Sequence, residues 1–308
     1  MNAMGDFVMT NIAFSESSDR HLKELAKTVE QRLSEYKAQA MSGIGEQREI
    51  AEAMWYSLSA GGKRIRPALV LEFCNICGGS TEEALPAACA LEMVHTFSLI
   101  HDDLPCMDDD DMRRGKPSCH AAYGEAQALL AGDALLNMAF DVICGGNGSA
   151  ETKIALISEL SRAAGINGMI GGQVIDTTYK GEITEDTLLK MYSMKTGALL
   201  KAACKMGCIA ARADTEKIKA AEQYAEKLGL AFQITDDILD IAGDEKLLGK
   251  PVGSDRENGK ITYASINGIE NSRSAAEKLT DEALKALDSF ENADFLRELT
   301  VFLLNREY

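Results

Sequence analysis

The sequence is poor in proline, in excess positive charge and in long apolar runs, and each shortage narrows what the chain can be. Only 5 prolines occur in 308 residues, so few positions interrupt a helix. The formal net charge of -16 argues against a nucleic-acid partner, because phosphate backbones are bound by an excess of Lys and Arg. No apolar run approaches the roughly 20 residues of a membrane span, and Met1–Ser18 lacks the basic start and apolar stretch of a signal peptide. We therefore expect a cytoplasmic protein without a membrane span.

The chain also lacks a zinc-binding pattern among its 8 cysteines. Cys74 and Cys77 form a C-x-x-C, but no second pair with zinc-like spacing follows and no histidines stand at metal spacing. We interpret the cysteines as small buried hydrophobes. A reducing cytoplasm suits this usage.

Segments with strand period, internal repeats and low-complexity linkers are absent as well. Apolar residues recur at three- and four-residue steps, which is typical of helices. The pattern predicts helices over 21–41, 49–59, 67–77, 82–101, 121–143, 153–165, 168–178, 188–208 and 218–242, with two more in 271–308. We expect one all-α domain over 1–308, in which 1–18 is loosely ordered.

An acidic stretch, Leu99–Gly115, is the densest chemical feature of the sequence. It contains six aspartates followed at once by Arg113 and Arg114. Neighbouring carboxylates raise one another's pKa unless cations compensate them, oxygen ligands suit Mg²⁺, and arginine forks suit phosphate. Pro105 disrupts the helix here, so we expect a bulge over 104–107 that returns Asp108 towards Asp102.

A basic loop, Gly61–Pro67, precedes a predicted helix. Its glycines let the backbone approach a ligand, the helix N-terminus favours anions, and Lys63, Arg64 and Arg66 add positive charge. The loop is interpreted as a phosphate site, with a solvated basic turn as the alternative. His95 lies two turns before Asp102 and is either a core residue or a ligand-binding one.

The second acidic motif lies on the helix predicted over 218–242. Gln233, Asp236 and Asp240 share one face of that helix, and carboxylates on an apolar helix are costly to bury unpaired; a metal ion would compensate them. In the preceding helix, Gly197 after Lys195 and Thr196 costs about 1 kcal/mol relative to alanine, which indicates a functional kink or a packing glycine. The loop with Lys250 and Lys260 is interpreted as a phosphate-contacting flap or a surface loop.

These motifs resemble those of the trans-type polyprenyl diphosphate synthases, and within them the bacterial farnesyl diphosphate synthases. The motifs G-G-K-R-I-R-P, H-D-D-L-P-C-M-D-D-D-D-M-R-R-G, G-G-Q-V-I-D, K-T-G, F-Q-I-T-D-D-I-L-D and G-K-P-V-G-S-D occur in the order of that family, without a departure. The resemblance implies an isoprenoid-synthase helical bundle around a central cavity, usually as a homodimer. It implies condensation of isopentenyl diphosphate with dimethylallyl and then geranyl diphosphate to give farnesyl diphosphate.

The resemblance also implies roles for individual residues. The site of isopentenyl diphosphate matches Lys63, Arg66, His95 and Arg114. The Mg²⁺ ligands match Asp102, Asp103, Asp108, Asp236 and, less directly, Asp240, with three ions once substrate is bound and Mn²⁺ as an alternative metal. The site of the allylic diphosphate matches Arg113, Lys195, Gln233, Lys250 and Lys260. Thr196 and Gln233 match groups that face the developing carbocation.

Phe97 and Ser98 are expected to set the length of the product. Phe97 lies five positions before Asp102, where a large ring in the resembling family goes with a C15 product. Ser98 is small, so geranylgeranyl diphosphate (C20) synthesis is the alternative. Other readings are a silent subunit of a heteromeric synthase, a Ca²⁺-binding protein and a terpene cyclase. The intact acidic motifs argue against a silent subunit. The aspartates are contiguous rather than spaced, which argues against a Ca²⁺-binding loop. A second basic site argues against a terpene cyclase.

Overall fold

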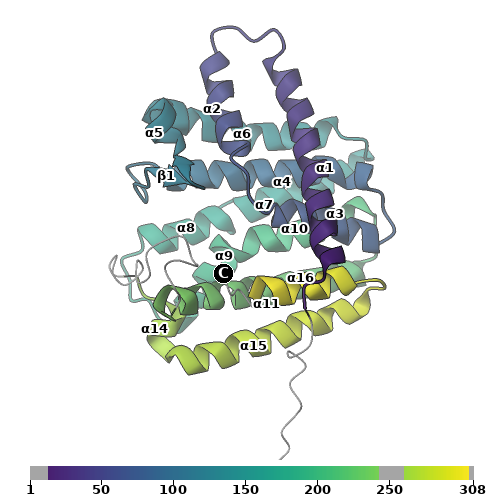
Figure 1. Ribbon diagram of the computed structural model, residues 1–308, viewed down its shortest axis with the longest axis vertical. Helices are drawn as coiled ribbons and strands as arrows, with labels where there is room; N and C mark the ends of the chain where they lie inside the picture. Colours follow the sequence, from purple (N-terminus) through teal and green to yellow (C-terminus); the bar gives the residue numbers. More distant parts are fainter. Residues whose placement is uncertain (1–12, 243–259, 305–308) are drawn as a thin grey trace, which may run out of the picture. The chain divides into compact units, whose positions relative to one another are not determined.

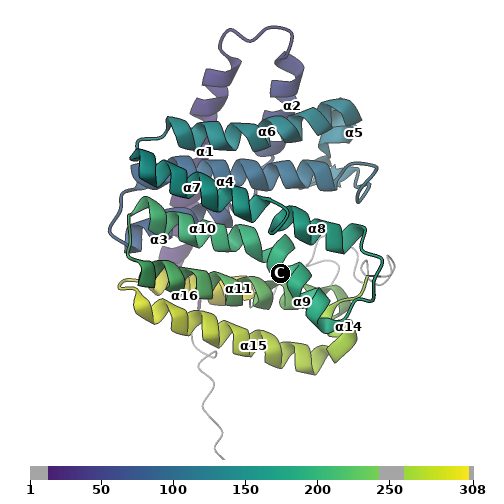
Figure 2. The same ribbon diagram turned by 180° about the vertical axis from the view of Figure 1, so that it is seen from behind.

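Helices account for nearly all the regular structure, as the apolar spacing predicts. Residues 13–242 and 260–304 are described in a computed structural model (Figures 1 and 2). The helices in chain order are α1 (Glu16–Met41), α2 (Arg48–Leu58), α3 (Ile65–Ile76), α4 (Thr81–Asp102), α5 (Cys119–Tyr123), α6 (Glu125–Gly145), α7 (Ala150–Ala164), α8 (Met169–Thr177), α9 (Glu185–Lys195), α10 (Gly197–Ala210), α11 (Thr215–Ala242), α14 (Tyr263–Asn267), α15 (Ile269–Ala286), the short 3-10 helix η2 (Leu287–Ser289) and α16 (Asp294–Leu304). The strands are β1 (Met112–Arg113) and β2 (Lys116–Pro117). The predicted all-α class is confirmed.

The described residues group into two compact units. The N-terminal unit comprises Arg20–Ser161 and Ala202–Asp214. The C-terminal unit comprises Arg162–Lys201, the described part of Thr215–Tyr308, and the described residues before Arg20. The expectation of one domain stays a prediction, and each unit is described by itself.

Helix α4 is the core of the N-terminal unit. It is buried on every face from Ala84 to Val94, and a helix that is apolar all round must be covered on all sides. Helices α3 and α6 pack against it, and α6 runs beside it in both views (Figures 1 and 2). At its start, the Ser80 N–H donates to Glu83 Oε2 at 2.9 Å, which satisfies a helix-terminal donor. Asp102 and Asp103 lie at its C-terminal end, next to the core of the unit.

Helix α6 corrects the expectation that no apolar segment approaches the length of a membrane span. Among the described residues, it alone combines that length with a suitable composition, with a mean hydropathy of 1.5. It packs against α4, α2 and α5, and its buried residues include Ala131, Leu135 and Ile143. These contacts cover part of its apolar surface, since 39% of the apolar window is buried.

Helix α11 is the centre of the C-terminal unit. Helices α15, α9, α14 and α16 pack against it, and α15 lies alongside it in both views (Figures 1 and 2). Helix α15 buries Ala276, Thr280, Ala283 and Leu284, which recur at helical spacing on one face. This packing makes α11 a rigid support for the second acidic motif.

Two of the predicted helices are each divided into two shorter helices. The segment 121–143 breaks at Gly124, whose φ of 85° favours glycine. The segment 188–208 breaks at Thr196, between α9 and α10. A Cβ at Gly229 on α11 would lie 3.1 Å from Gly197 Cα, so the absence of a side chain at Gly229 permits α11 to pack closely on the start of α10.

Candidate active site

A two-residue hairpin turn orients Arg114. Strands β1 and β2 pair antiparallel, with Arg113 opposite Lys116. Between them, Arg114 and Gly115 have φ of 53° and 74°, the positive values that a type I′ turn requires at both central residues. A non-glycine residue rarely adopts this conformation. The sequence analysis missed this hairpin because strands of two residues are too short to show an alternation of apolar and polar residues. The signal that the sequence offers for it is Gly115, which follows Arg114.

The Arg114 guanidinium lies on the glycines of the basic loop. Arg114 Nη1 donates a hydrogen bond to the Gly61 carbonyl oxygen. A Cβ at Gly62 would be 3.0 Å from Arg114 Cζ, and Gly62 has a φ of 124°. The glycines therefore permit a close approach, as predicted, and the group that approaches them here is Arg114.

Arg66, His95 and Arg114 form a cluster of basic groups in the N-terminal unit. Arg66 Nη1 lies 3.5 Å from His95 Nε2, and Arg66 Nε is buried without a hydrogen-bond partner among the described residues. Burial lowers the pKa of both arginines. Burial also lowers the pKa of His95 well below its usual range, and the nearby guanidinium groups lower it further. A bound anion would relieve this repulsion and satisfy the buried donor.

Arg64 has a structural role, although its place in the basic loop predicts that it binds phosphate. It is 4% exposed, and its Nη1 donates to Glu92 Oε1 at 2.5 Å. Its Nη2 donates to the Leu58 carbonyl at 2.7 Å. Since the buried Glu92 carboxylate compensates its charge, Arg64 anchors the loop to α4. The interpretation of Arg64 as a phosphate-site charge is therefore wrong.

The turn after α4 brings Asp108 back to Asp102, as Pro105 predicts. The Asp108 N–H donates to the Asp102 carbonyl oxygen at 2.8 Å, and the Met107 N–H donates to Leu104 O at 2.8 Å. Asp109 has a φ of 56°, in the left-handed region. The expected bulge over 104–107 is confirmed.

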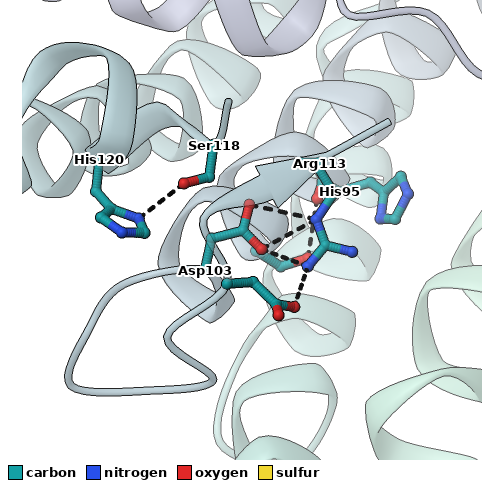
Figure 3. Close-up of polar contacts among 7 residues, drawn as sticks. His95, Asp103, Arg113, Ser118 and His120 are labelled. Atoms are coloured by element: carbon teal, nitrogen blue, oxygen red, sulfur yellow. Dashed lines mark hydrogen bonds and ion pairs between the residues drawn. The ribbon is translucent and has the colours of Figure 1, made fainter. Parts of the chain in front are cut away.

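Asp103 and Arg113 form an ion pair beside this turn (Figure 3). Arg113 Nε donates to Asp103 Oδ1 at 2.9 Å, and its Nη2 reaches Asp110 Oδ2 at 3.2 Å. Asp103 is 2% exposed. Burial raises the pKa of Asp103, against the opposing effect of Arg113. The carboxylate expected to bind metal and the guanidinium expected to bind diphosphate are thus bonded to each other here.

The C-terminal unit has a cavity of about 370 Å³ among α8, α9, α11 and the segment before α14. Its polar lining residues are Asp176, Tyr179, Tyr192, Lys195, Thr196, Gln233, Asp237, Lys260 and Thr262. Lys195 Nζ is paired with Asp176, and Thr196 Oγ1 donates to Gln233 Oε1 at 3.0 Å. The structure therefore gathers four of the predicted residues, Lys195, Thr196, Gln233 and Lys260, in one cavity.

Asp237 organises one wall of this cavity and was missed by the prediction. Its carboxylate accepts hydrogen bonds from Tyr192 Oη at 2.5 Å and from the Tyr263 N–H at 2.8 Å. Gln233 Nε2 lies 3.5 Å from its Oδ1. Asp237 stands four residues after Gln233, so the two share a face of α11. This spacing is the signal in the sequence that could have identified Asp237. Asp236 and Asp240 are not among the residues that line this cavity.

The chain matches known proteins over most of its length. A family model described as polyprenyl synthetase matches residues 47–300. The chain is 47% identical over 262 residues to a geranylgeranyl diphosphate synthase of Cyanophora paradoxa. This match covers 83% of this chain and 87% of that synthase. It is 41% identical over 305 residues to a farnesyl diphosphate synthase of Bacillus subtilis (strain 168), at 97% and 100% coverage.

The chain belongs to the polyprenyl synthetase family. Its fold agrees with the solved geranylgeranyl pyrophosphate synthetase of Pyrococcus horikoshii Ot3, with a TM-score of 0.86, 32% identity, and coverage of 95% and 99%. It is a short-chain prenyltransferase, an enzyme of isoprenoid biosynthesis.

Enzymes of this family typically depend on Mg²⁺, and the acidic turn of this synthetase offers donors of the type that this ion prefers. Asp102 and Asp108 offer carboxylates from two ends of one hydrogen-bonded turn, and oxygen is the ligand that Mg²⁺ prefers. In the described part of the chain, no three acidic, His or Cys side chains already converge as a metal cluster. Arg113 must therefore release Asp103 if Asp103 is to become a ligand.

Three further predicted site residues are Lys250, Lys63 and Ser98. Lys250 lies outside the described residues. Lys63 is exposed on the basic loop of the synthetase, and Ser98 Oγ donates to the His95 carbonyl at 2.9 Å. The expectations of a homodimer and of a cytoplasmic location stay predictions.

Proposed function

We propose that the enzyme condenses isopentenyl diphosphate with dimethylallyl and then geranyl diphosphate and releases (2E,6E)-farnesyl diphosphate. The observation that carries the C15 assignment is the setting of Phe97. Its side chain is buried on α4, at 6% exposure. Its ring meets His101 edge-on, with centroids 5.0 Å apart. A bulky ring held at this depth before Asp102 would block a longer chain.

His101 makes that ring hard to displace. The His101 ring lies close over Gly132 of α6, where a Cβ would be 2.2 Å from His101 Nε2. Nε2 also bonds to the Leu129 carbonyl at 3.0 Å. Because His101 is fixed on one side, Phe97 cannot move towards it to make room.

We assign the proposed binding residues to the two diphosphate groups. Arg66, His95 and Arg114, with Lys63, hold the diphosphate of isopentenyl diphosphate. The allylic diphosphate is held by Arg113, Lys195, Gln233, Lys250 and Lys260. The proposed metal ligands are Asp102, Asp103, Asp108, Asp236 and Asp240. Held by these carboxylates, Mg²⁺ would neutralise charge on the diphosphate leaving group.

Loss of diphosphate from the allylic substrate leaves an allylic cation. Nearby oxygen atoms, rather than a base, are needed to stabilise its positive charge. The hydrogen-bonded oxygens of Thr196 and Gln233 supply dipoles for that positive charge. The double bond of isopentenyl diphosphate, held in place by the basic cluster, then attacks the cation. The proton lost in this step goes to the released diphosphate, so the protein needs no general base.

Product length tests this proposal. We expect F97A to extend the product from C15 to C20 or longer, because removal of the ring lengthens the space available to the growing chain. The matched control is F97Y, which keeps a ring and should keep the C15 product. The measurement is chromatography of products formed from labelled isopentenyl diphosphate and dimethylallyl diphosphate with Mg²⁺. A C15 product from both variants would count against the role of Phe97.

Geranylgeranyl diphosphate synthesis is the second candidate. It is favoured by the 47% identity to the Cyanophora paradoxa synthase, against 41% for the Bacillus subtilis farnesyl diphosphate synthase. The small Ser98 beside Phe97 adds room. A predominantly C20 product from the unaltered enzyme would establish this candidate and reject the first.

Removal of Arg114 should mainly weaken binding of isopentenyl diphosphate. A hydrogen bond to a charged group contributes about 1.5–3 kcal/mol, so we expect R114A to raise KM for that substrate about 10–100-fold. The control is R212A, which removes an arginine of the same unit paired to Glu83, outside the basic cluster. Steady-state kinetics with each substrate varied separately measures both. An R114A enzyme with the KM of R212A would show that Arg114 does not bind this diphosphate.

A further inference from the structure

Four of the cysteines lie at the contact between α3 and α10 in the N-terminal unit. Cys74 and Cys77 stand at the end of α3, and Cys204 and Cys208 stand one helical turn apart on α10. In the described part of the chain, no three cysteine, histidine or acidic side chains are arranged as a metal cluster. The chemistry available to this group is therefore that of thiols.

Two glycines bring the two helices close enough for the thiols to meet. A Cβ at Gly207 on α10 would be 2.4 Å from the Val70 carbonyl oxygen, so the backbone of α10 lies directly on α3. A Cβ at Gly79 would be 2.8 Å from Ala211 Cβ, so the loop after α3 packs on the end of α10. As a result, Cys77 Sγ lies 3.7 Å from Cys208 Sγ, and the Cys77 thiol donates to it.

We propose that Cys77 and Cys208 are a dithiol site that a low-molecular-weight disulfide oxidises to an intramolecular disulfide. Cys77 is half-buried and can be reached from solvent, whereas Cys74, Cys204 and Cys208 are all 0% exposed. Cys77 therefore reacts first and Cys208 second. The pair spans 131 positions of the chain, so the new bond joins two helices that are distant in sequence.

The two steps balance as ordinary thiol–disulfide exchange. The Cys77 thiolate attacks one sulfur of the small disulfide, forms a mixed disulfide and releases one small thiol. Cys208 Sγ then attacks the sulfur of Cys77, loses its proton to water and releases the second small thiol. The protein loses two electrons and two protons, and the small disulfide is reduced to two thiols. Burial raises the pKa of the Cys74 thiol, and the hydrogen bond with Cys77 together with burial raises the pKa of the Cys208 thiol, so acidity does not separate them. Cys208 is the second reactant because its Sγ lies 3.7 Å from Cys77 Sγ.

The experiment treats the full-length enzyme with glutathione disulfide, quenches with acid, alkylates the remaining thiols and maps the peptides by mass spectrometry. We expect a peptide that links Cys77 to Cys208 in the unaltered protein. In C208A, Cys77 should stop at the mixed disulfide and carry one glutathione; in C77S, neither product should form. The matched control is C74S, on the same helix, which should keep the Cys77–Cys208 bond.

Stability gives a second, independent readout. A disulfide across so long a segment restricts the unfolded chain, so the oxidised protein should melt at least about 4 °C higher than the reduced one. Oxidised C208A should show no such rise. Three results in the unaltered protein would each overturn the proposal. They are a disulfide between Cys74 and Cys77, a Cys77 thiol that stays reduced and is recovered alkylated, and a mixed disulfide that persists at Cys77.

Discussion

Replacing Asp102 with asparagine is expected to lower kcat/KM for prenyl transfer by about 10²–10³-fold, the loss seen when a group that stabilises developing charge is removed. Asp102 ends α4, and its main-chain carbonyl accepts the hydrogen bond that returns Asp108 to it. Asparagine keeps the shape of the side chain and this main-chain bond but removes the negative charge that would bind Mg²⁺. Initial rates over a range of Mg²⁺ concentrations measure the effect.

The control for this variant is D141N, which removes an exposed carboxylate from α6 in the same unit. It should leave both the rate and the Mg²⁺ dependence unchanged. Circular dichroism should confirm that both variants fold. If D102N were as active as D141N at every Mg²⁺ concentration, Asp102 would not be a metal ligand.

Substitution of Glu92 with glutamine should destabilise the enzyme by about 3–5 kcal/mol, because the buried Arg64 charge then keeps only the exposed Glu30 carboxylate, 3.6 Å from its Nε. The Arg64 and Glu92 side chains are both 2% exposed, so water cannot take over the role of the Glu92 carboxylate. The free energy of unfolding, measured by urea denaturation, tests this. Because Arg64 is the residue between Lys63 and the α3 N-terminus, the folded fraction should also bind isopentenyl diphosphate more weakly.

Two controls separate the buried charge from other effects of E92Q. E35Q removes one of the two acidic partners of Arg32, the other being Glu82. The Glu35 side chain is 57% exposed, so its loss should cost only about 0–1 kcal/mol. The double variant R64M/E92L removes both charges and should recover much of the lost stability. Equal losses in E92Q and E35Q would show that the Arg64–Glu92 pair is not effectively buried.

The features predicted correctly are those whose cause lies within one or two turns of chain. Pro105 lacks a backbone donor, so a break after α4 and the return of Asp108 could be expected from that residue alone. The apolar composition of α4 and the apolar spacing of α11 likewise need no distant partner. The chemistry of the acidic and basic motifs follows from residue types that stand side by side in the sequence.

Two of the errors concern residues whose role depends on a partner far along the chain, and another concerns a short local hairpin. Arg64 and Arg66 are both arginines of one loop, yet only Arg64 meets Glu92 and becomes structural. Asp237 stands beside Asp236, but its partner Tyr192 lies on another helix. The hairpin at Arg114 left no period to detect, because its strands have two residues each.

The amino-acid sequence by itself determined the all-helical class, the two acidic motifs and the type of chemistry that they can perform, because helix period, backbone donors and side-chain charge are local properties. Only the tertiary structure decided which of these charges are neutralised by the protein and which remain to bind a ligand. It also decided which two thiols meet, since Cys77 and Cys208 are joined by nothing in the sequence and are brought together by the packing of Gly207 on α3. Burial and pairing depend on the whole packed unit, and no short stretch of sequence contains that information.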